Sequence, residues 1–457
     1  MRCIASATFC ANRQKRRRSR MRIGGTEADT RMRIGWALVV FYAVFVAMGI
    51  LNIYSATYDP QLPSLFDLSQ YGGKQLLFAA MSVVIVVVVL LLEMSVYERM
   101  AWLFYIFSIV LLLGLPVLGS EVKGNRAWYN LGFVSLQPSE IAKFATALAL
   151  SSYLSSYNVS MSRLRCQAIA AAIILLPMGL VGLQDAGSAL VFLSFFLVLY
   201  MAGAPGIYFV VGILSAVIFI ADVFLSFYQV SPVYVYAVVG GAALLTGIYR
   251  LWRHQGGVGR LAVATVFVLG IYSVLHFAVW EHVFKEYQRQ RILTSFKLVE
   301  DYKGVGFNTY QSEIAIGSGG FTGKGYLMGT QTKGNFVPEQ HTDFIFSTLG
   351  EEWGFLGAAG VVVLYALFLI QIVRVAARQR TLFARNYGWC VFSVFFFHFL
   401  VNVGMAVGLL PVIGIPLPFF SYGGSSLWSF TILLFILVKL DAHRRDVLPE
   451  VSHFEDR

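Results

Sequence analysis

The sequence predicts an all-α polytopic membrane protein with about 10–12 transmembrane helices. Three observations predict this fold class: the composition, the length of the apolar stretches and the placement of basic residues. Of the 457 residues, 58% are hydrophobic and only 13% are charged, and the mean hydropathy is +0.70. Because a soluble protein carries about 25% charged residues, this chain cannot build a water-facing surface of ordinary size.

Twelve apolar stretches are candidates for membrane spans. A helix needs about 20 apolar residues to cross a hydrocarbon core of about 30 Å. The expected spans are residues 34–56, 75–93, 100–118, 138–156, 166–183, 187–203, 206–228, 232–250, 260–282, 342–373, 387–410 and 422–440.

The basic residues predict the orientation. Short loops on one side of the membrane, 57–73 and 229–232, contain no Arg or Lys. Loops on the other side carry Arg99, Arg163, Arg165, Arg250, Arg253, Arg260, Arg374, Arg378, Arg380 and Arg385. Since cytoplasmic loops are enriched in Lys and Arg, both termini are expected in the cytoplasm. Two long segments, 119–137 and 283–341, would then face the exterior, and long loops on a rigid scaffold commonly carry function.

The net charge of +11 comes mainly from the N-terminus. Residues 1–33 contain ten basic and two acidic side chains, so the rest of the chain is close to neutral and nucleic-acid binding is not indicated. One expectation is a basic, disordered cytoplasmic tail beside anionic lipid; the alternative is an upstream start, with Met21 or Met32 as the true initiator. No cleavable signal peptide is expected. Residues 34–445 would form one transmembrane domain, followed by a cytoplasmic tail at 446–457.

The four cysteines are scattered along the chain, at Cys3, Cys10, Cys166 and Cys390. No pair has the spacing of metal ligands, and none falls in an expected outer loop where a disulfide would be favoured. We therefore expect free thiols.

The long outer loop 283–341 is rich in glycine between residues 304 and 325. These glycines argue against a long regular helix. The interleaved Ile314, Ile316 and Phe321 argue against a flexible linker, which seldom carries so many large apolar groups. Short amphipathic helices along the bilayer surface, or backbone folded close to a ligand, are therefore expected.

Asp343 is the candidate catalytic residue. It follows Thr342 at the outer mouth of the expected span 342–373. Simple N-capping by Thr342, with the acid favoured by the helix dipole, is the alternative to a functional role. Glu339 and His341 are close in sequence, and ionisable groups at a membrane edge are functional by default, which favours an active site.

A second polar group begins the span 138–156. Pro138 suits the first turn of a helix, and Glu140 favours its positive end. Lys143 lies three residues later on the same helical face. Such a pair is commonly a surface salt bridge, but within hydrocarbon it is expected to face a polar cavity. Trp128, in the preceding loop, is either an interfacial anchor or part of the site.

The last external segment, 407–426, contains three prolines and two adjacent glycines between apolar residues. Backbone interrupted in this way is tolerated inside a protein or beside water. We expect a re-entrant loop that roofs the cavity.

Several strings, in order over about residues 120–430, resemble the shape, elongation, division and sporulation (SEDS) family, which includes RodA and FtsW. The strings are GNRAWYNLGFVSLQPSEIAKF, LQDAGSALV, YQRQRI, QSEIAIGSGG, GTQTKGNFVPEQHTDFIFSTLGEEWGF and GLLPVIGIPLPFFSYGGSS. FVPEQHTDFIFS is more similar to the RodA branch. The resemblance implies a peptidoglycan glycosyltransferase that polymerises lipid II at the outer face of the cytoplasmic membrane during cell elongation. It also implies a partner, a class B penicillin-binding protein with transpeptidase activity.

The resemblance further implies site residues. The family's essential external aspartate falls on Asp343 and its external tryptophan on Trp128. Its Gln-Pro-Ser-Glu helix start falls on 137–140, with Lys143 matching the following lysine. The other substrate-binding residues expected within the matching strings are Arg126, Gln137, Ser139, Glu140, Asp185, Arg291, Lys324, Glu339, His341, Thr342 and Ser421.

The chain departs from the family pattern in three places. Ala127 stands where members often have a basic residue, with Arg126 one position earlier. The usual Gln-Pro-Asp motif is Gln184-Asp185, without the proline. Residues 206–282 hold three expected spans rather than one or two, and we expect the extra hairpin, around 206–250, to lie outside the catalytic cavity.

The expected chemistry needs one base and one or more cations. Asp343 would be the general base or would position the acceptor sugar. Arg126, Lys143, Lys324 or Arg291 would contact pyrophosphate, alone or with a divalent ion such as Mg²⁺ or Mn²⁺. The rival functions are a transporter that flips lipid II and a scaffold that only recruits a partner. The unusual residues cluster on the outer side, which favours catalysis.

Overall fold

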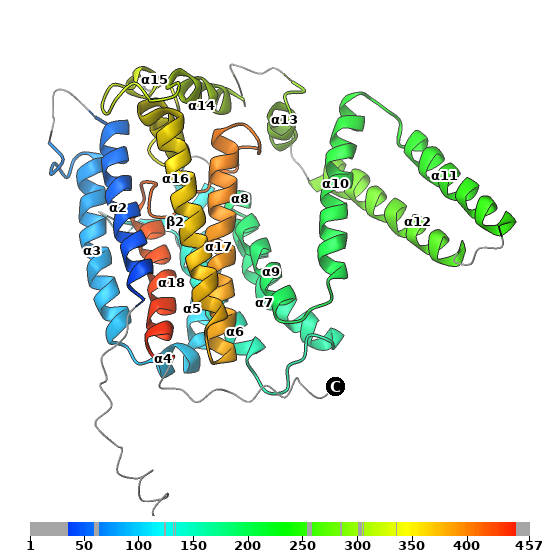
Figure 1. Cartoon of the computed structure of the whole chain (residues 1–457), viewed down its shortest axis with the longest axis horizontal. Coiled ribbons are helices and arrows are strands. Elements are labelled where there is room, and N and C mark those ends of the chain that lie inside the picture. The colour runs from blue at the N-terminus through cyan, green and yellow to red at the C-terminus, as the bar shows by residue number, and fades with distance from the viewer. Residues whose placement is uncertain are drawn as a thin grey trace, which may run out of the picture.

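The structure, a computed structural model, describes residues 35–444 apart from 59–63, 123–124, 131, 133, 254–257, 284–285, 300–303, 305 and 335. The fold is an upright helical bundle with a second, smaller group of helices beside it (Figure 1). The predicted tails, 1–33 and 446–457, lie outside the described residues.

The bundle is built from helices at both ends of the chain. α16 packs on α17 and α2, α5 on α6, and α18 on α3, so helices from the two ends of the chain lie side by side. The bundle helices are α2 (Trp36–Ala56), α3 (Tyr71–Leu91), α4 (Met94–Arg99), α5 (Ala101–Leu118), α6 (Pro138–Leu154), α7 (Leu164–Gly182), α8 (Ala186–Leu190), η1 (Val191–Phe195), α9 (Phe196–Met201), α16 (Ile345–Ala377), α17 (Leu382–Ala406) and α18 (Gly424–Ala442).

All twelve predicted stretches fold as helices. Among the described residues, ten helices are long and apolar enough to cross a membrane. The two others are α6, with 17 residues, and the interrupted segment Ala186–Met201. The chain is therefore a multi-pass membrane protein, as predicted from its hydropathy.

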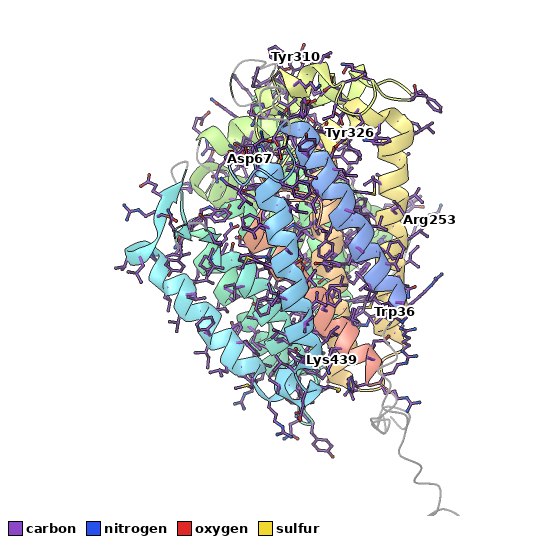
Figure 2. All side chains as sticks on the ribbon, turned by 90° about the vertical axis from the view of Figure 1, so that its left-hand side faces the viewer. Trp36, Asp67, Arg253, Tyr310, Tyr326 and Lys439 are labelled. Carbon is purple, nitrogen blue, oxygen red and sulfur yellow. The ribbon has the colours of Figure 1, made fainter. Side chains whose placement is uncertain are left out.

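The two ends of the described chain lie at the same end of the bundle. Figure 2 places Trp36 and Lys439 toward one end and Asp67, Tyr310 and Tyr326 toward the other. This arrangement agrees with the predicted parity of the spans. The assignment of the first end to the cytoplasm stays a prediction.

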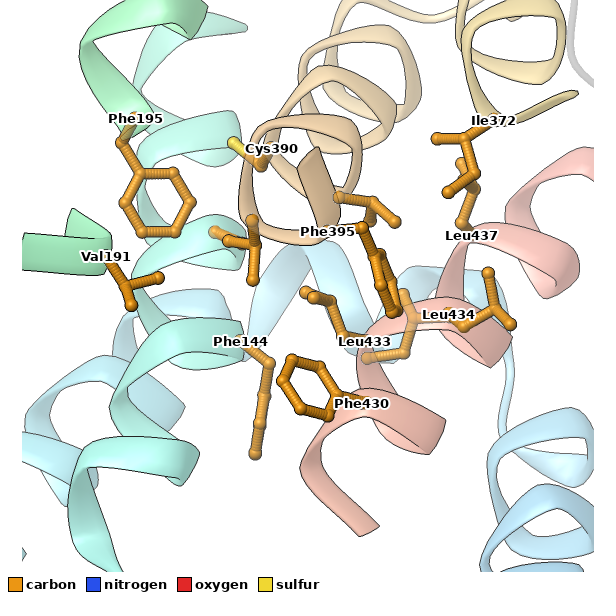
Figure 3. Close-up of a cluster of buried hydrophobic side chains, with 14 of the residues drawn as sticks. Phe144, Val191, Phe195, Ile372, Cys390, Phe395, Phe430, Leu433, Leu434 and Leu437 are labelled. Carbon is orange, nitrogen blue, oxygen red and sulfur yellow. The ribbon is translucent and has the colours of Figure 1, made fainter. Parts of the chain in front are cut away.

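The bundle core is apolar and lies between α6, α17 and α18 (Figure 3). Phe144, Phe395 and Phe430 lie there, with Leu433 and Leu434 beside them. α6 reaches the centre because alanines, at 142, 145, 147 and 149, let neighbouring backbones approach closely. The same centre holds the buried thiol of Cys390. Both described cysteines, Cys166 and Cys390, are free, as predicted.

The helices between α9 and the outer loop lie beside the bundle rather than in it (Figure 1). They pack mainly on one another, and only 6–11% of their apolar windows are buried. They are α10 (Ile207–Phe227), α11 (Pro232–Trp252), α12 (Val258–Ser273) and the π-helix η2 (Val274–Val283). The predicted extra hairpin thus lies away from the bundle centre.

A layer of short elements lies at the end of the bundle away from Trp36 (Figures 1 and 2). The helices there are α13 (Glu286–Ser295), α14 (Phe307–Ser318) and α15 (Thr330–Lys333). The Tyr326 hydroxyl donates to the Leu51 carbonyl on α2, and burial raises the pKa of Tyr326 to about 12, so the group stays a neutral donor. This hydrogen bond ties the layer to the first helix.

The segment before α6 differs from the all-α prediction. It forms three short antiparallel strands, β1 (Ser120–Val122), β2 (Asn125–Asn130) and β3 (Ser135–Leu136), in the order β1-β2-β3. The aromatic residues of β2 favour an extended chain. Helices still make up almost all of the regular structure.

α16 starts later than predicted and is interrupted. Thr342 does not cap it, because Phe344 is the N-cap and the Thr342 hydroxyl donates to the carboxylate of Glu339 at 3.0 Å. Gly354 breaks the helix with φ 61° and ψ −161°, a conformation that favours glycine. A side chain there would collide with the backbone carbonyl carbon of Thr322, 2.8 Å from an added Cβ. The break therefore lets the outer loop pass close to α16.

Candidate active site

The N-terminal turns of α6 carry a buried ion pair. Pro138 occupies the first turn, as predicted. The ammonium of Lys143 lies 2.7 Å from Glu140 Oε1, and both side chains are 2% exposed. The i,i+3 spacing predicted this contact. Glu140 Oε2 and the Ser139 hydroxyl are buried and form no hydrogen bond with any residue that the structure describes, so they remain available as polar contacts for a ligand.

α17 brings a histidine to the same lysine. His398 is fully buried, and its Nε2 lies 3.0 Å from Lys143 Nζ. The His398 ring also packs edge-on against Phe430, with 4.8 Å between the ring centres. The lysine ammonium lies 4.9 Å from the centre of the Phe430 ring. Residues from α6, α17 and α18 therefore surround one buried charge.

The segment between α17 and α18, residues 407–423, is irregular and runs into the bundle. Phe419 and Phe420 are buried, and the Tyr365 hydroxyl on α16 donates to the Pro418 carbonyl. The interrupted backbone thus lies inside protein, as predicted for a re-entrant loop. Ser421, a predicted substrate ligand, accepts a hydrogen bond from the backbone N–H of Leu417 at 2.8 Å.

Five consecutive residues of this segment, 412–416, contact different parts of the site; we call them the hub. The Pro416 carbonyl lies 3.0 Å from His398 Nδ1, and the Ile415 carbonyl accepts a hydrogen bond from Asn402 at 2.9 Å. Gly414 lies beside the Asp343 carboxylate, whose Oδ2 is 3.3 Å from where a Cβ would be. The hub therefore links Asp343 to the group around Lys143.

Asp343 itself is half-buried in the turn before α16. The side-chain amide of Asn402 donates to its backbone carbonyl at 2.8 Å and at the same time to the hub. This double contact fixes the backbone of Asp343 against α17. The carboxylate is directed toward the hub, at Gly414, rather than toward lipid.

Two further predicted residues reach the hub. Asp185 caps α8, accepting backbone hydrogen bonds from Gly187 and Ser188, and Gly187 lies directly against the Ile413 carbonyl. Asp185 is also close enough to Lys143 to interact with it electrostatically. Arg291 on α13 donates to the Val412 carbonyl at 3.4 Å while its side chain stays exposed. The hub thus has an acid and an exposed cation at its edge.

The turn that holds Asp343 also contains Glu339, His341 and Thr342. Glu339 adopts φ 55°, and its carbonyl accepts hydrogen bonds from the backbone N–H groups of Thr342 and Phe344. The His341 ring lies 4.4 Å from that of Tyr71 on α3. This ring contact joins the turn that holds Asp343 to α3.

Other predicted residues lie apart from this group. Lys324 forms a 2.7 Å ion pair with the buried Glu351, whose carboxylate also accepts the backbone N–H groups of residues 330–332. Arg126 is 58% exposed on β2 and pairs with Glu121 at 3.7 Å. Trp128, also on β2, is paired in register with Ser120. Gln137 directly precedes α6 and is half-buried, and it makes no side-chain cap.

An apolar cavity of about 470 Å³ lies beside α6, where Ile141 and Phe144 line it. Its wall includes Leu103 and Phe107, which are more than half exposed on the surface of α5. Its inner side includes Ser429, whose hydroxyl donates to the Glu140 carbonyl. The cavity therefore connects the lipid-facing surface with the start of α6.

Sequence reasoning missed His398, Asn402 and Glu351. Each is a polar or ionisable residue inside a stretch predicted to span the membrane, and that position alone was the available signal. The structure adds what the sequence could not show, namely that the first two contact the predicted residues Lys143 and Asp343.

The fold and the site define a multi-pass helical membrane protein with charged residues gathered around an interrupted inner loop. The chain belongs to the FtsW/RodA/SpoVE family of cell cycle proteins, which it matches over residues 36–238 and 256–446. It is 35% identical over 371 residues to the peptidoglycan glycosyltransferase MrdB of Escherichia coli (strain K12), covering 80% of this chain and 84% of that protein. It is 34% identical over 432 residues to the peptidoglycan glycosyltransferase RodA of Treponema pallidum (strain Nichols), covering 90% and 98%.

Solved structures are similar in fold. One, described as "Structural coordination of polymerization and crosslinking by a peptidoglycan synthase complex", superposes with a TM-score of 0.66 at 29% identity, covering 91% of this chain and 99% of that one. The rod shape determining protein RodA of Thermus thermophilus gives a TM-score of 0.56 at 26% identity, covering 90% and 98%.

Proposed function

We propose that this protein is a peptidoglycan glycosyltransferase that polymerises lipid II at the outer face of the cytoplasmic membrane. One observation carries the proposal: the hub lies beside the Asp343 carboxylate at Gly414 and is linked through His398 to the buried charge of Lys143. A sugar-transfer reaction on a pyrophosphate-linked lipid needs a base for the acceptor hydroxyl and a cation for the leaving group. The names of the relatives agree with this activity.

The reaction forms one bond and breaks one. The 4-hydroxyl oxygen of the acceptor sugar attacks the anomeric carbon of the donor, while the bond from that carbon to the undecaprenyl pyrophosphate oxygen breaks. The hydroxyl proton passes to Asp343, and the pyrophosphate leaves with the bonding electrons. General-base catalysis of this kind contributes about 10²–10⁴-fold, and fixed geometry supplies much of the rest.

Lys143 and Arg291 are the best candidates to contact the pyrophosphate. Lys143 is buried close to the hub, and Arg291 reaches the hub from outside. A preorganised cation beside the leaving group stabilises the charge that develops on it. Lys324 and Arg126 lie apart from the hub, where they pair with Glu351 and Glu121, so they fit a structural role better.

A test of the cations uses two arginine variants. Arg291→Gln should raise the KM for lipid II about tenfold, because it removes one charge-assisted contact. Arg253→Gln is the matched control, since Arg253 lies at the end of α11, beside the bundle. An unchanged KM for Arg291→Gln would remove this residue from the site.

The apolar cavity suits the lipid part of the substrate. It opens on the membrane-facing side of α5 and ends beside the backbone of Glu140. A long-chain lipid could therefore enter sideways from the bilayer while its headgroup stays at the polar site.

A divalent ion such as Mg²⁺ or Mn²⁺ would need ligands from the substrate as well as from the protein. The part of the chain that the structure describes brings no three His, Cys, Asp or Glu side chains into one metal-binding group. Magnesium, however, is commonly held by one or two carboxylates plus substrate phosphates. Metal titration with lipid II present is therefore the appropriate measurement of a metal requirement.

The biological setting is also proposed. An elongation role is favoured because the MrdB and RodA relatives are 34–35% identical, whereas the FtsW relatives are 27–29% identical. A class B penicillin-binding protein is the proposed partner, since one similar fold comes from a peptidoglycan synthase complex. The active site would face the periplasm of the inner membrane.

One experiment separates polymerisation from transport. The purified protein, with and without its partner, is placed in liposomes that contain fluorescent lipid II. The proposal predicts glycan chains sensitive to muramidase digestion. Movement of lipid II between leaflets without chain formation would instead support a flippase.

A further inference from the structure

His398 has two distinct hydrogen-bond partners in the middle of α17. Its Nδ1 lies 3.0 Å from the Pro416 carbonyl oxygen, and its Nε2 lies 3.0 Å from the ammonium of Lys143. The residue is fully buried. A buried histidine at a membrane protein's polar site requires a reason, because a polar group placed there without partners is costly.

The partners define the state of the ring. A carbonyl oxygen can only accept, so Nδ1 must carry the proton and donate to Pro416. In the neutral ring Nε2 then has a lone pair, which accepts from the Lys143 ammonium. A doubly protonated ring would direct an N–H at that ammonium, and the two positive groups would repel each other. The geometry therefore selects the neutral tautomer with the proton on Nδ1.

Two of the three donors of Lys143 then have hydrogen-bond partners. One meets Glu140 Oε1 at 2.7 Å and another meets His398. The ammonium also faces the Phe430 ring at 4.9 Å, an attractive arrangement for a cation. Only Glu140 among these three groups carries a charge. His398 and Phe430 fix the direction of the ammonium without neutralising it.

We propose that His398 is a positioning residue that orients Lys143 for the pyrophosphate of the substrate and couples it to the hub. The His398 ring contacts both Lys143 and Pro416 of the hub. Two residues earlier in the hub, Gly414 lies beside Asp343. Asn402 stands one helical turn away on the same face of α17 and fixes Asp343 to Ile415. One face of α17 therefore holds both Lys143 and the backbone of Asp343 in place relative to the hub.

This inference rests on the proposed function only for the role of Lys143 toward pyrophosphate. The tautomer and the lysine contact are properties of the protein alone. They can be measured without substrate, so the inference and the proposed function can fail separately.

The first test is spectroscopic. The protein, labelled with ¹⁵N at its 7 histidines and reconstituted in lipid, is measured by solid-state NMR, with His398→Gln used to assign the signal. We expect a protonated Nδ1 and an unprotonated Nε2, and we expect the Nε2 signal to shift in Lys143→Met because its donor is removed. A proton on Nε2, or a signal unaffected by Lys143→Met, would overturn the contact.

The second test is kinetic and uses two variants. His398→Phe keeps a ring against Phe430 but removes both hydrogen bonds, so kcat for lipid II polymerisation should fall about 10–100-fold, with KM changed less than about threefold. His398→Gln offers an acceptor to Lys143 and should restore most of kcat. The positioning role is wrong if His398→Phe is as active as the wild type. It is also wrong if both variants lose activity only in proportion to the amount of folded protein that is lost. Inactive wild-type protein would count against the proposed function, while the NMR result would still decide the contact.

Discussion

Replacing Lys143 by methionine should destabilise the protein strongly. The Lys143 and Glu140 side chains are each 2% exposed, and their charged atoms are 2.7 Å apart. Removing one partner of a buried ion pair costs about 3–5 kcal/mol, because the other charge is left uncompensated. The cost should lie in the upper part of this range, since no described residue donates a hydrogen bond to Glu140 Oε2 even in the intact pair.

Removing both charges should cost much less than removing one. Uncharged groups of similar volume often replace a buried pair at little net cost, so Glu140→Gln combined with Lys143→Met should lose less than about 2 kcal/mol. Thermal unfolding of the purified variants in detergent, followed by tryptophan fluorescence, measures the cycle. Arg126→Met, which breaks the exposed pair with Glu121, is the control and should leave the melting temperature unchanged. Additive losses in the double variant would refute the assigned coupling.

Three further predictions concern the support of the site. Gly354→Ala should lower the melting temperature sharply, because its φ of 61° and the adjacent Thr322 backbone leave no room for a side chain. Gly360→Ala on the same helix is the control: an added Cβ meets nothing within 4 Å, so the melting temperature should not change. Asn402→Leu should lower the free energy of unfolding by about 2–4 kcal/mol, since two carbonyls lose their donor. Polymerisation activity should fall by more than the loss of folded protein explains. Equal losses of activity and folded protein would make Asn402 purely structural. Lys324→Met should increase proteolysis of the loop around residues 324–334 without raising the KM for lipid II, because this lysine is paired with Glu351; a raised KM would return it to the substrate site.

Local patterns in the sequence predicted the helices and the start of α6 well. A window of apolar residues is sufficient to form a span, and the i,i+3 spacing of Glu140 and Lys143 is sufficient to bring them together. The break at Gly354 could not be predicted in the same way. A glycine in an apolar helix is tolerated, and only the close approach of residues 322–323 makes the positive φ necessary here.

The partners of the charged residues were the part that the sequence could not supply. Counting cations in the outer loops identified Lys324 and Arg126 as candidates, but whether a cation meets a carboxylate of the protein or a ligand depends on tertiary packing. The contact between Lys143 and His398 joins residues 255 positions apart. No local rule connects them, and the irregular hub that aligns them follows from the whole bundle.

The kinetics of Asp343→Asn test the central claim most directly. The claim is that this carboxylate, held beside Gly414, takes the proton of the acceptor hydroxyl. The amide keeps the shape but accepts no proton, so kcat should fall at least about 100-fold while lipid II binding changes less than about threefold. Asp67→Asn, a carboxylate-to-amide change toward the same end of the bundle, should keep full activity. An Asp343→Asn protein that polymerises lipid II at the wild-type rate would contradict the account.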